Sequence, residues 1–81
     1  MEKKYKIVLC SQEKQVEFAK LCSKFSFDIN LCKGTYIVDA KSVLGVCSID
    51  TSKDCFVKIN SIVENSQIKK FEEQLNQYMD K

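Results

Sequence analysis

The sequence predicts an α+β domain, a two-layer open-faced β-sandwich in which a four-stranded antiparallel sheet carries three helices on one face. Short runs of β-branched and aromatic residues alternate with two stretches whose apolar residues recur every three or four positions. A glycine joins two of the strand-like runs at hairpin distance. The expected order is strand, helix, strand, strand, short helix, strand, helix. At 81 residues the chain (1–81) is expected to build a single domain around one core.

The first strand and the first helix are expected in the N-terminal third of the chain. Residues 5–10, YKIVLC, have the composition and length of a strand. From Val16 onward the apolar residues follow the i, i+3, i+4, i+7 spacing of an amphipathic helix: Phe18, Leu21, Cys22 and Phe25. Ser11 is expected to cap this helix, and Glu13 suits the positive end of its dipole.

A hairpin is expected next. Residues 27–32 alternate between apolar and polar side chains, as in a strand with one buried face. Gly34 can adopt the positive φ of a tight turn, and residues 36–39 then form the returning strand. Residues 54–59 are the fourth strand. The final helix has an apolar stripe of Ile68, Phe71, Leu75 and Tyr78, and its start is open between a capping box at residues 61–64 and caps at Asn65 or Ser66.

The segment between the hairpin and the fourth strand, residues 39–49, reads DAKSVLGVCSI. It is too apolar for a surface loop and too short for an independent helix. We expect a short helix that lies between the sheet and solvent. Val43 and Val46 are the expected core contacts, and Leu44 and Cys47 are expected near the surface.

The composition excludes several functions. The formal charge is only +2, from thirteen lysines and eleven acidic residues that alternate along the chain, which is a weak field for nucleic acid. The chain has no His, Arg, Trp or Pro, so imidazole catalysis, Ser-His nucleophiles and bidentate arginine clamps on phosphate are excluded. No apolar run reaches the length of a membrane span or of a signal peptide, so we expect a cytoplasmic protein without membrane partners.

The five cysteines are interpreted as small buried hydrophobic residues in a reducing compartment. Their number is odd, no two form a CxxC pair, and no histidine is available to complete a zinc site. Neither a metal site nor a cofactor is therefore expected. The five are Cys10, Cys22, Cys32, Cys47 and Cys55.

Several short segments together resemble HPr, the histidine-containing phosphocarrier family of the bacterial sugar phosphotransferase system. The segments are SKF at 23–25, DINL at 28–31, KSVLGVCSI at 41–49 and KD at 53–54. The resemblance covers nearly the whole chain, and KSxxGxxS between a hairpin and a strand is its most specific part. It implies an HPr-like fold of order βαββαβα over residues 1–81.

The resemblance also implies site residues. In the family, the short helix begins at the serine of KSxxG, which a regulatory kinase phosphorylates in Gram-positive lineages. This implies Ser42 as the regulatory phosphorylation site. The apolar residues of the helix border the family's docking face for partner proteins, which implies Leu44 and Cys47 as partner-binding positions, with Lys20 and Lys24 on the first helix beside them.

The family's phosphoryl-accepting loop is absent. Its histidine aligns with Ser11, its arginine with Glu13 and its proline with Lys14. Phosphohistidine cannot form without His, and Glu13 would repel a phosphoryl group where the family has a stabilising arginine. We therefore expect no catalytic residue and no enzyme.

The favoured hypothesis is a non-catalytic HPr-like regulatory module that binds a protein partner through the first and second helices. One alternative is a phosphocarrier-like protein that uses Ser11 as acceptor, although phosphoserine is a poor phosphoryl donor. Another is a small nucleic-acid-binding or ligand-binding α+β domain. RNA binding is disfavoured because the aromatic residues of the strands, Tyr5, Phe27, Tyr36 and Phe56, mostly fall in core-like patterns.

Overall fold

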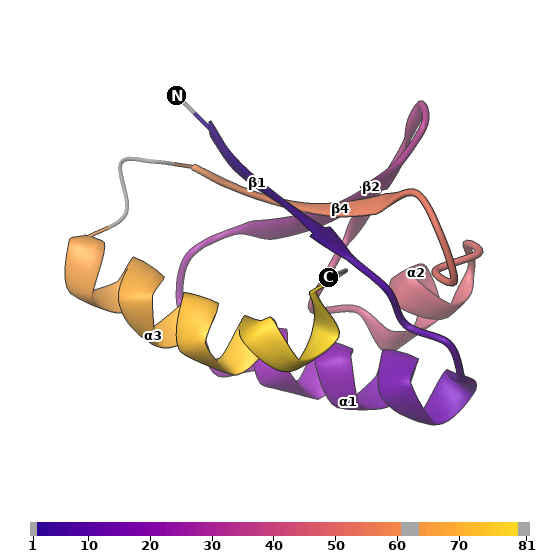
Figure 1. Ribbon diagram of the computed structural model, residues 1–81, viewed down its shortest axis with the longest axis horizontal. Helices are drawn as coiled ribbons and strands as arrows, with labels where there is room; N and C mark the ends of the chain where they lie inside the picture. Colours follow the sequence, from indigo (N-terminus) through magenta and orange to yellow (C-terminus); the bar gives the residue numbers. More distant parts are fainter. Residues whose placement is uncertain (1, 61–63, 80–81) are drawn as a thin grey trace.

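The computed structural model describes residues 2–60 and 64–79, which form two layers, a twisted sheet and a layer of helices on one of its faces (Figure 1). The predicted α+β class and order of elements are confirmed. The elements are β1 (Glu2–Ile7), α1 (Gln12–Ser23), β2 (Ile29–Lys33), β3 (Tyr36–Asp39), α2 (Val43–Cys47), β4 (Cys55–Asn60), α3 (Asn65–Leu75) and a 3₁₀ turn, η1 (Asn76–Tyr78).

The sheet has the strand order β1-β4-β2-β3, and every neighbouring pair is antiparallel. Alternate residues of each strand face the helices. The buried members of this inward set are Ile7, Ile29, Leu31, Cys55, Val57 and Ile59. Because this face is covered, a register shift of one residue would expose the whole set, so the pairing is strongly specified.

Aromatic side chains of the two long helices fill the space under the sheet. Phe71 of α3 contacts Phe25 edge-on, with ring centroids 5.3 Å apart. Phe18 of α1 contacts Tyr78 in the same way at 5.7 Å. Both phenylalanines of the helices are fully buried. Edge-to-face pairs of this kind add to the free energy gained by burying the rings.

The predicted cap and turn are confirmed. Ser11 precedes α1, and its Oγ accepts a hydrogen bond from the backbone N–H of Lys14 at 3.2 Å. The helix therefore starts earlier than the apolar stripe from Val16 suggested, because the cap sets the first turn. Gly34 has a φ of 59°, as the hairpin requires.

Three details of the prediction are wrong at the level of single residues. Residues 8–10 leave the sheet after β1, because the N–H of Val8 donates to the carbonyl of Tyr78 at 2.8 Å and that of Leu9 to Thr51 at 2.8 Å. Glu64 occupies the N-cap position of α3 and makes no side-chain cap bond, so neither Asn65 nor Ser66 caps it. The residues 61–63 of the expected capping box lie outside the described residues.

Val43 is the third correction. We expected it in the core, but 39% of its surface is exposed, whereas Val46 is fully buried. A helix of five residues presents only one turn to the core, and Val46 occupies that inward position.

No helix of the described residues is long and apolar enough to cross a membrane.

Leu31→Ala and Leu44→Ala form a matched test of this core. Leu31 is fully buried, whereas Leu44 is 85% exposed. We expect Leu31→Ala to lower the free energy of unfolding by about 2–5 kcal/mol because it leaves a cavity, and Leu44→Ala to change it by less than about 0.5 kcal/mol. Urea denaturation followed by circular dichroism measures both, and equal losses would contradict the assigned layers.

Candidate functional site

Helices α1 and α2 pack against each other in opposite directions, and hydrogen bonds join them at both ends. Near the end of α1, Ser23 Oγ donates to the carbonyl of Ala19 at 2.9 Å and to that of Lys41 at 3.4 Å. Near its start, Gln15 Nε2 donates to Thr51 Oγ1 at 2.9 Å, just beyond α2. The start of α2 is therefore held beside the end of α1.

Ser42 is the N-cap of α2. Its Oγ accepts a hydrogen bond from the backbone N–H of Gly45 at 3.1 Å, and the side chain is half-buried. Gly45 lies close to this cap, because a Cβ added there would come within 3.3 Å of the Asp39 carbonyl oxygen and of Ser42 Cβ. The serine and the glycine of KSxxG thus form one compact turn.

The predicted partner-binding residues lie on these two helices. Leu44 is 85% exposed, Cys47 is half-buried, and Lys20 and Lys24 are exposed at the C-terminal end of α1. Val43, which the sequence analysis assigned to the core, is exposed beside Leu44. We call Lys20, Lys24, Val43, Leu44 and Cys47 the helical face.

Ser11 lies at the other end of α1, next to the exposed Cys10. It borders a shallow depression of about 180 Å³, whose lining also includes Gln15, Asp50 and Thr51. Hydrogen bonds from the Ser52 hydroxyl and backbone N–H, at 2.6 and 3.0 Å, hold the pKa of the Asp50 carboxyl below its usual range, with a smaller contribution from the Lys33 ammonium.

These neighbours do not favour phosphoryl transfer. Asp50 is anionic beside the depression, and no described residue supplies an imidazole. The hydrogen bond that Ser11 Oγ forms with Lys14 is the ordinary bond of a helix cap. Ser11 and Ser42 lie at opposite ends of α1, so the structure does not bring them together.

The sequence profile described as the PTS HPr component phosphorylation site matches residues 15–80. The chain belongs to the HPr family. The match begins at Gln15 and leaves Ser11, Glu13 and Lys14 outside it. No curated protein sequence matches the chain.

Solved HPr structures share this fold. HPr-C-His from Thermoanaerobacter tengcongensis is 26% identical, with a TM-score of 0.69 over 95% of this chain and 92% of that one. The phosphocarrier protein HPr from Bacillus anthracis is 24% identical, with a TM-score of 0.71 over 99% and 96%. The histidine-containing phosphocarrier protein of Mycoplasma is 15% identical, with a TM-score of 0.64 over 100% of both chains.

Two hydrogen bonds of this HPr-family chain could not be predicted from its sequence. Gln15 Nε2 bonds the buried Thr51, whose Oγ1 donates to the carbonyl of Leu9 at 2.9 Å. This chain of bonds ties α1 to the two loops beside Ser11. A lone glutamine on a helix and a threonine in a polar loop carry no periodic signal, so only the folded arrangement reveals their role.

The cysteines of the HPr-family chain follow the predicted burial in part. Cys22, Cys32 and Cys55 are buried, whereas Cys10 is exposed and Cys47 half-buried. Burial raises the pKa of the Cys22 thiol from 9.0 to about 12, and it also raises that of Cys55. Within residues 2–60 and 64–79, no three His, Cys, Asp or Glu side chains gather as a metal ion would need.

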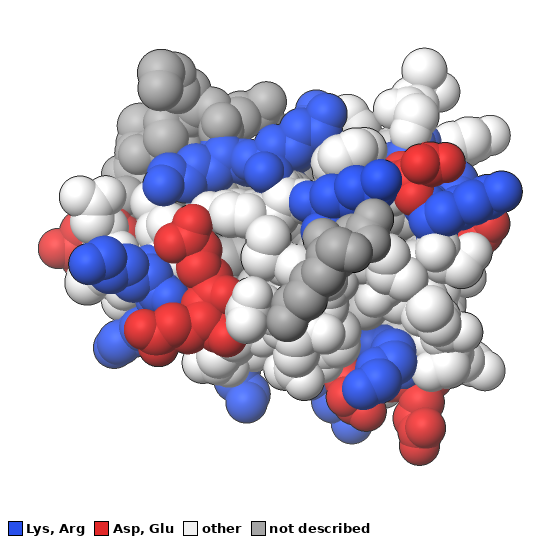
Figure 2. Space-filling view, viewed as in Figure 1, with Lys and Arg blue, Asp and Glu red and all other residues white. Residues whose placement is uncertain are grey.

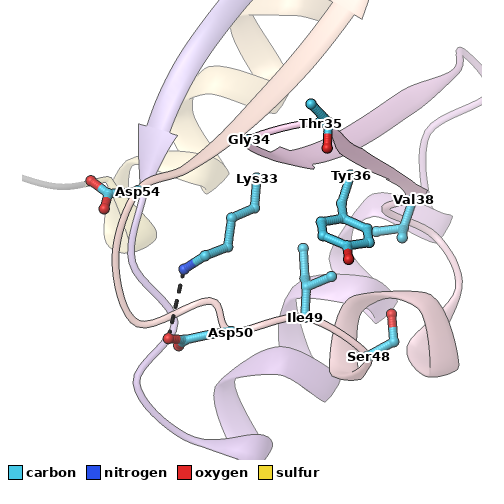
Figure 3. Close-up of a pocket in the computed structure, with 9 residues that line it drawn as sticks. All are labelled: Lys33, Gly34, Thr35, Tyr36, Val38, Ser48, Ile49, Asp50 and Asp54. Atoms are coloured by element: carbon cyan, nitrogen blue, oxygen red, sulfur yellow. Dashed lines mark ion pairs between the residues drawn. The ribbon is translucent and has the colours of Figure 1, made fainter.

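A groove lies between the β2–β3 hairpin and the loop after α2, with a volume of about 870 Å³ (Figure 3). Tyr36, Val38 and Ile49 form its apolar wall, and Lys33 points into it. The Lys33 ammonium lies 3.6 Å from Asp50 Oδ2 and donates to the Lys53 carbonyl at 2.9 Å. Its charge is therefore already compensated within the protein.

Alkylation tests the assigned burial of the thiols. We expect iodoacetamide at pH 8 to modify Cys10 first and Cys47 more slowly, and to spare Cys22, Cys32 and Cys55 while the chain is folded. Burial excludes the reagent, and the raised pKa of Cys22 and Cys55 keeps their reactive thiolate scarce. Peptide mass spectrometry reads the pattern, and labelling in urea, where all five should react, is the control. Rapid folded-state labelling of Cys22 would contradict it.

Proposed function

We propose that this HPr-family protein is a non-catalytic regulatory module that binds a protein partner through its helical face. The observation that carries the proposal is the arrangement at α2, where Leu44 is 85% exposed two residues after Ser42. Leu44 lies next to the exposed Val43, and adjoining exposed apolar side chains are more typical of a binding surface than a single one.

Charge and apolar surface are combined on this face. Lys20 and Lys24 are exposed on α1, which packs against α2. An interface with an apolar centre and a charged rim gains its affinity mainly from the buried centre, whereas the rim sets the encounter rate. Leu44 and Val43 supply such a centre, and the lysines favour a partner with acidic residues around its binding pocket.

Ser42 is proposed as a switch for this face. A phosphate there would add about 1.5–2 negative charges beside the exposed Leu44. It would also replace the hydroxyl that now accepts the Gly45 N–H bond at 3.1 Å. Both changes alter the surface that a partner contacts, so phosphorylation would change which partners bind.

Transfer of phosphate through Ser11 is not supported. The chain has no His, so the phosphohistidine of the family cannot form. Asp50 and Glu13 would repel a phosphoryl group near Ser11, and phosphoserine has little tendency to pass its phosphate on. We therefore propose that the end of α1 near Ser11 has a structural role.

Phosphorylation tests the switch. The protein is incubated with a regulatory kinase of the HPr family and ATP, beside Ser42→Ala as the matched control. We expect one added phosphate at Ser42 by peptide mass spectrometry and none on the control. A phosphate at another residue, or no phosphate on the unaltered chain, would exclude the switch while leaving the docking proposal standing.

The variant Leu44→Asp tests whether the helical face binds a partner. We expect it to weaken binding to the regulatory kinase by at least about tenfold, because it places a charge at the centre of the interface. Gln74→Asp is the control, since it adds the same charge at an exposed position of α3 outside the helical face. Surface plasmon resonance measures both. Equal affinities of the two variants would argue against the helical face.

A further inference from the structure

The face of the sheet that the helices leave open carries an uneven distribution of charge. Lys4 on β1 stands directly opposite Lys58 on β4, and both side chains point away from the helices. The next pair on the same face is Lys6 opposite Phe56, two residues along each strand. Figure 2 shows lysine side chains gathered along the side of the molecule that carries the sheet. The β1–β4 half of the open face is therefore basic.

Like charges directly opposite each other in a sheet are destabilising. Among residues 2–60 and 64–79, Lys4 and Lys58 take part in no ion pair. The acidic residue of the same row, Asp39 on β3, pairs with Asn30 and lies two strands from Lys58, and its Oδ1 accepts the N–H of Lys41 at 3.0 Å. Within the part of the chain that the structure describes, the fold thus keeps the ammonium groups of Lys4 and Lys58 on adjacent strands without a carboxylate partner.

On the other half of this face the row beyond Phe56 is apolar, whereas the neighbouring row holds Asn30 and Asp39. Phe56 is half-buried, and it pairs with Cys32 on β2, which pairs with Ile37 on β3. Ile37 is 64% exposed, although it is a large aliphatic residue. The row therefore runs from a lysine, across an aromatic ring, to an exposed aliphatic side chain at the sheet edge.

We propose that this open face, defined by Lys4, Lys58, Phe56 and Ile37, is a second docking surface, and that it binds an acidic protein segment with an apolar end. Its carboxylates would lie over β1 and β4, and its apolar residues over β2 and β3. With strands about 4.8 Å apart, the four strands span roughly 14 Å, about four residues of an extended chain. The surface is on the opposite side of the sheet from the helical face.

The chemistry favours a protein segment over single-stranded nucleic acid. Sheet faces that bind RNA stack bases on two or three aromatic rings, whereas the described part of this face has one, Phe56. The Lys4 ammonium lies 4.2 Å from the centroid of that ring and occupies the position a base would take. The chain also contains no arginine, and its net charge is only +2. Ile37 offers an apolar contact but no stacking surface.

The test uses a fluorescent synthetic peptide with a run of glutamates followed by a pair of leucines. At low salt we expect it to shift the backbone amide resonances of residues 4, 37, 56 and 58 in NMR spectra, with little effect on α2. Binding should weaken as salt is added, because the attraction is between exposed charges.

Two double variants separate the surface from general charge. Lys4→Glu with Lys58→Glu should reduce affinity at least about tenfold. Lys69→Glu with Lys70→Glu changes the net charge equally on exposed positions of α3 and should reduce it far less. Phe56→Ala, with the lysines intact, should also weaken the peptide. Circular dichroism confirms that each variant is folded.

Three results would overturn the proposal. They are peptide shifts confined to the helices, equal losses for the two double variants, and tighter binding of a uridine oligonucleotide than of the peptide at the same salt. The last result would assign the face to nucleic acid instead.

Discussion

Burial of one face of the sheet is the constraint on which the rest of this structure depends. Phe18 and Phe71, carried by α1 and α3, cover the inward residues of the strands and are themselves excluded from solvent. Because the side chains of a strand alternate, covering one set determines the register of every pair. It also determines which residues are left on the other side, so the open face follows from the core.

The same layer positions α2. Five residues cannot form a stable helix in water, so α2 depends on its contacts with α1 and on the burial of Val46. Ser23 donates to the Lys41 carbonyl just before α2, and Gln15 donates to the Val46 carbonyl within it. Holding α2 in this way presents Leu44 to solvent, and the exposure that favours a binding role is thus a consequence of how a short helix must be anchored.

The residues that place this chain in the HPr family, 15–80, do not include Ser11, which aligns with the family's histidine. The fold depends on the core and on the turns, which tolerate changes in an exposed loop. Ser11 continues to cap α1, so the helix start remains stable without the family's acceptor. The fold of the family is therefore retained in a chain that contains no histidine.

The sequence by itself determined the α+β class, the order of elements, the cap at Ser11 and the turn at Gly34, because these depend on periodicity and on local backbone preferences. It also determined that phosphohistidine cannot form, since no histidine is present. Only the tertiary structure decided that Val43 is exposed and that Gln15 bonds Thr51. It alone decided, too, that Phe56 faces outward among lysines. These properties depend on contacts between segments that are distant in the chain. The alternation of side chains within one strand cannot predict which face of the strand the helices will cover.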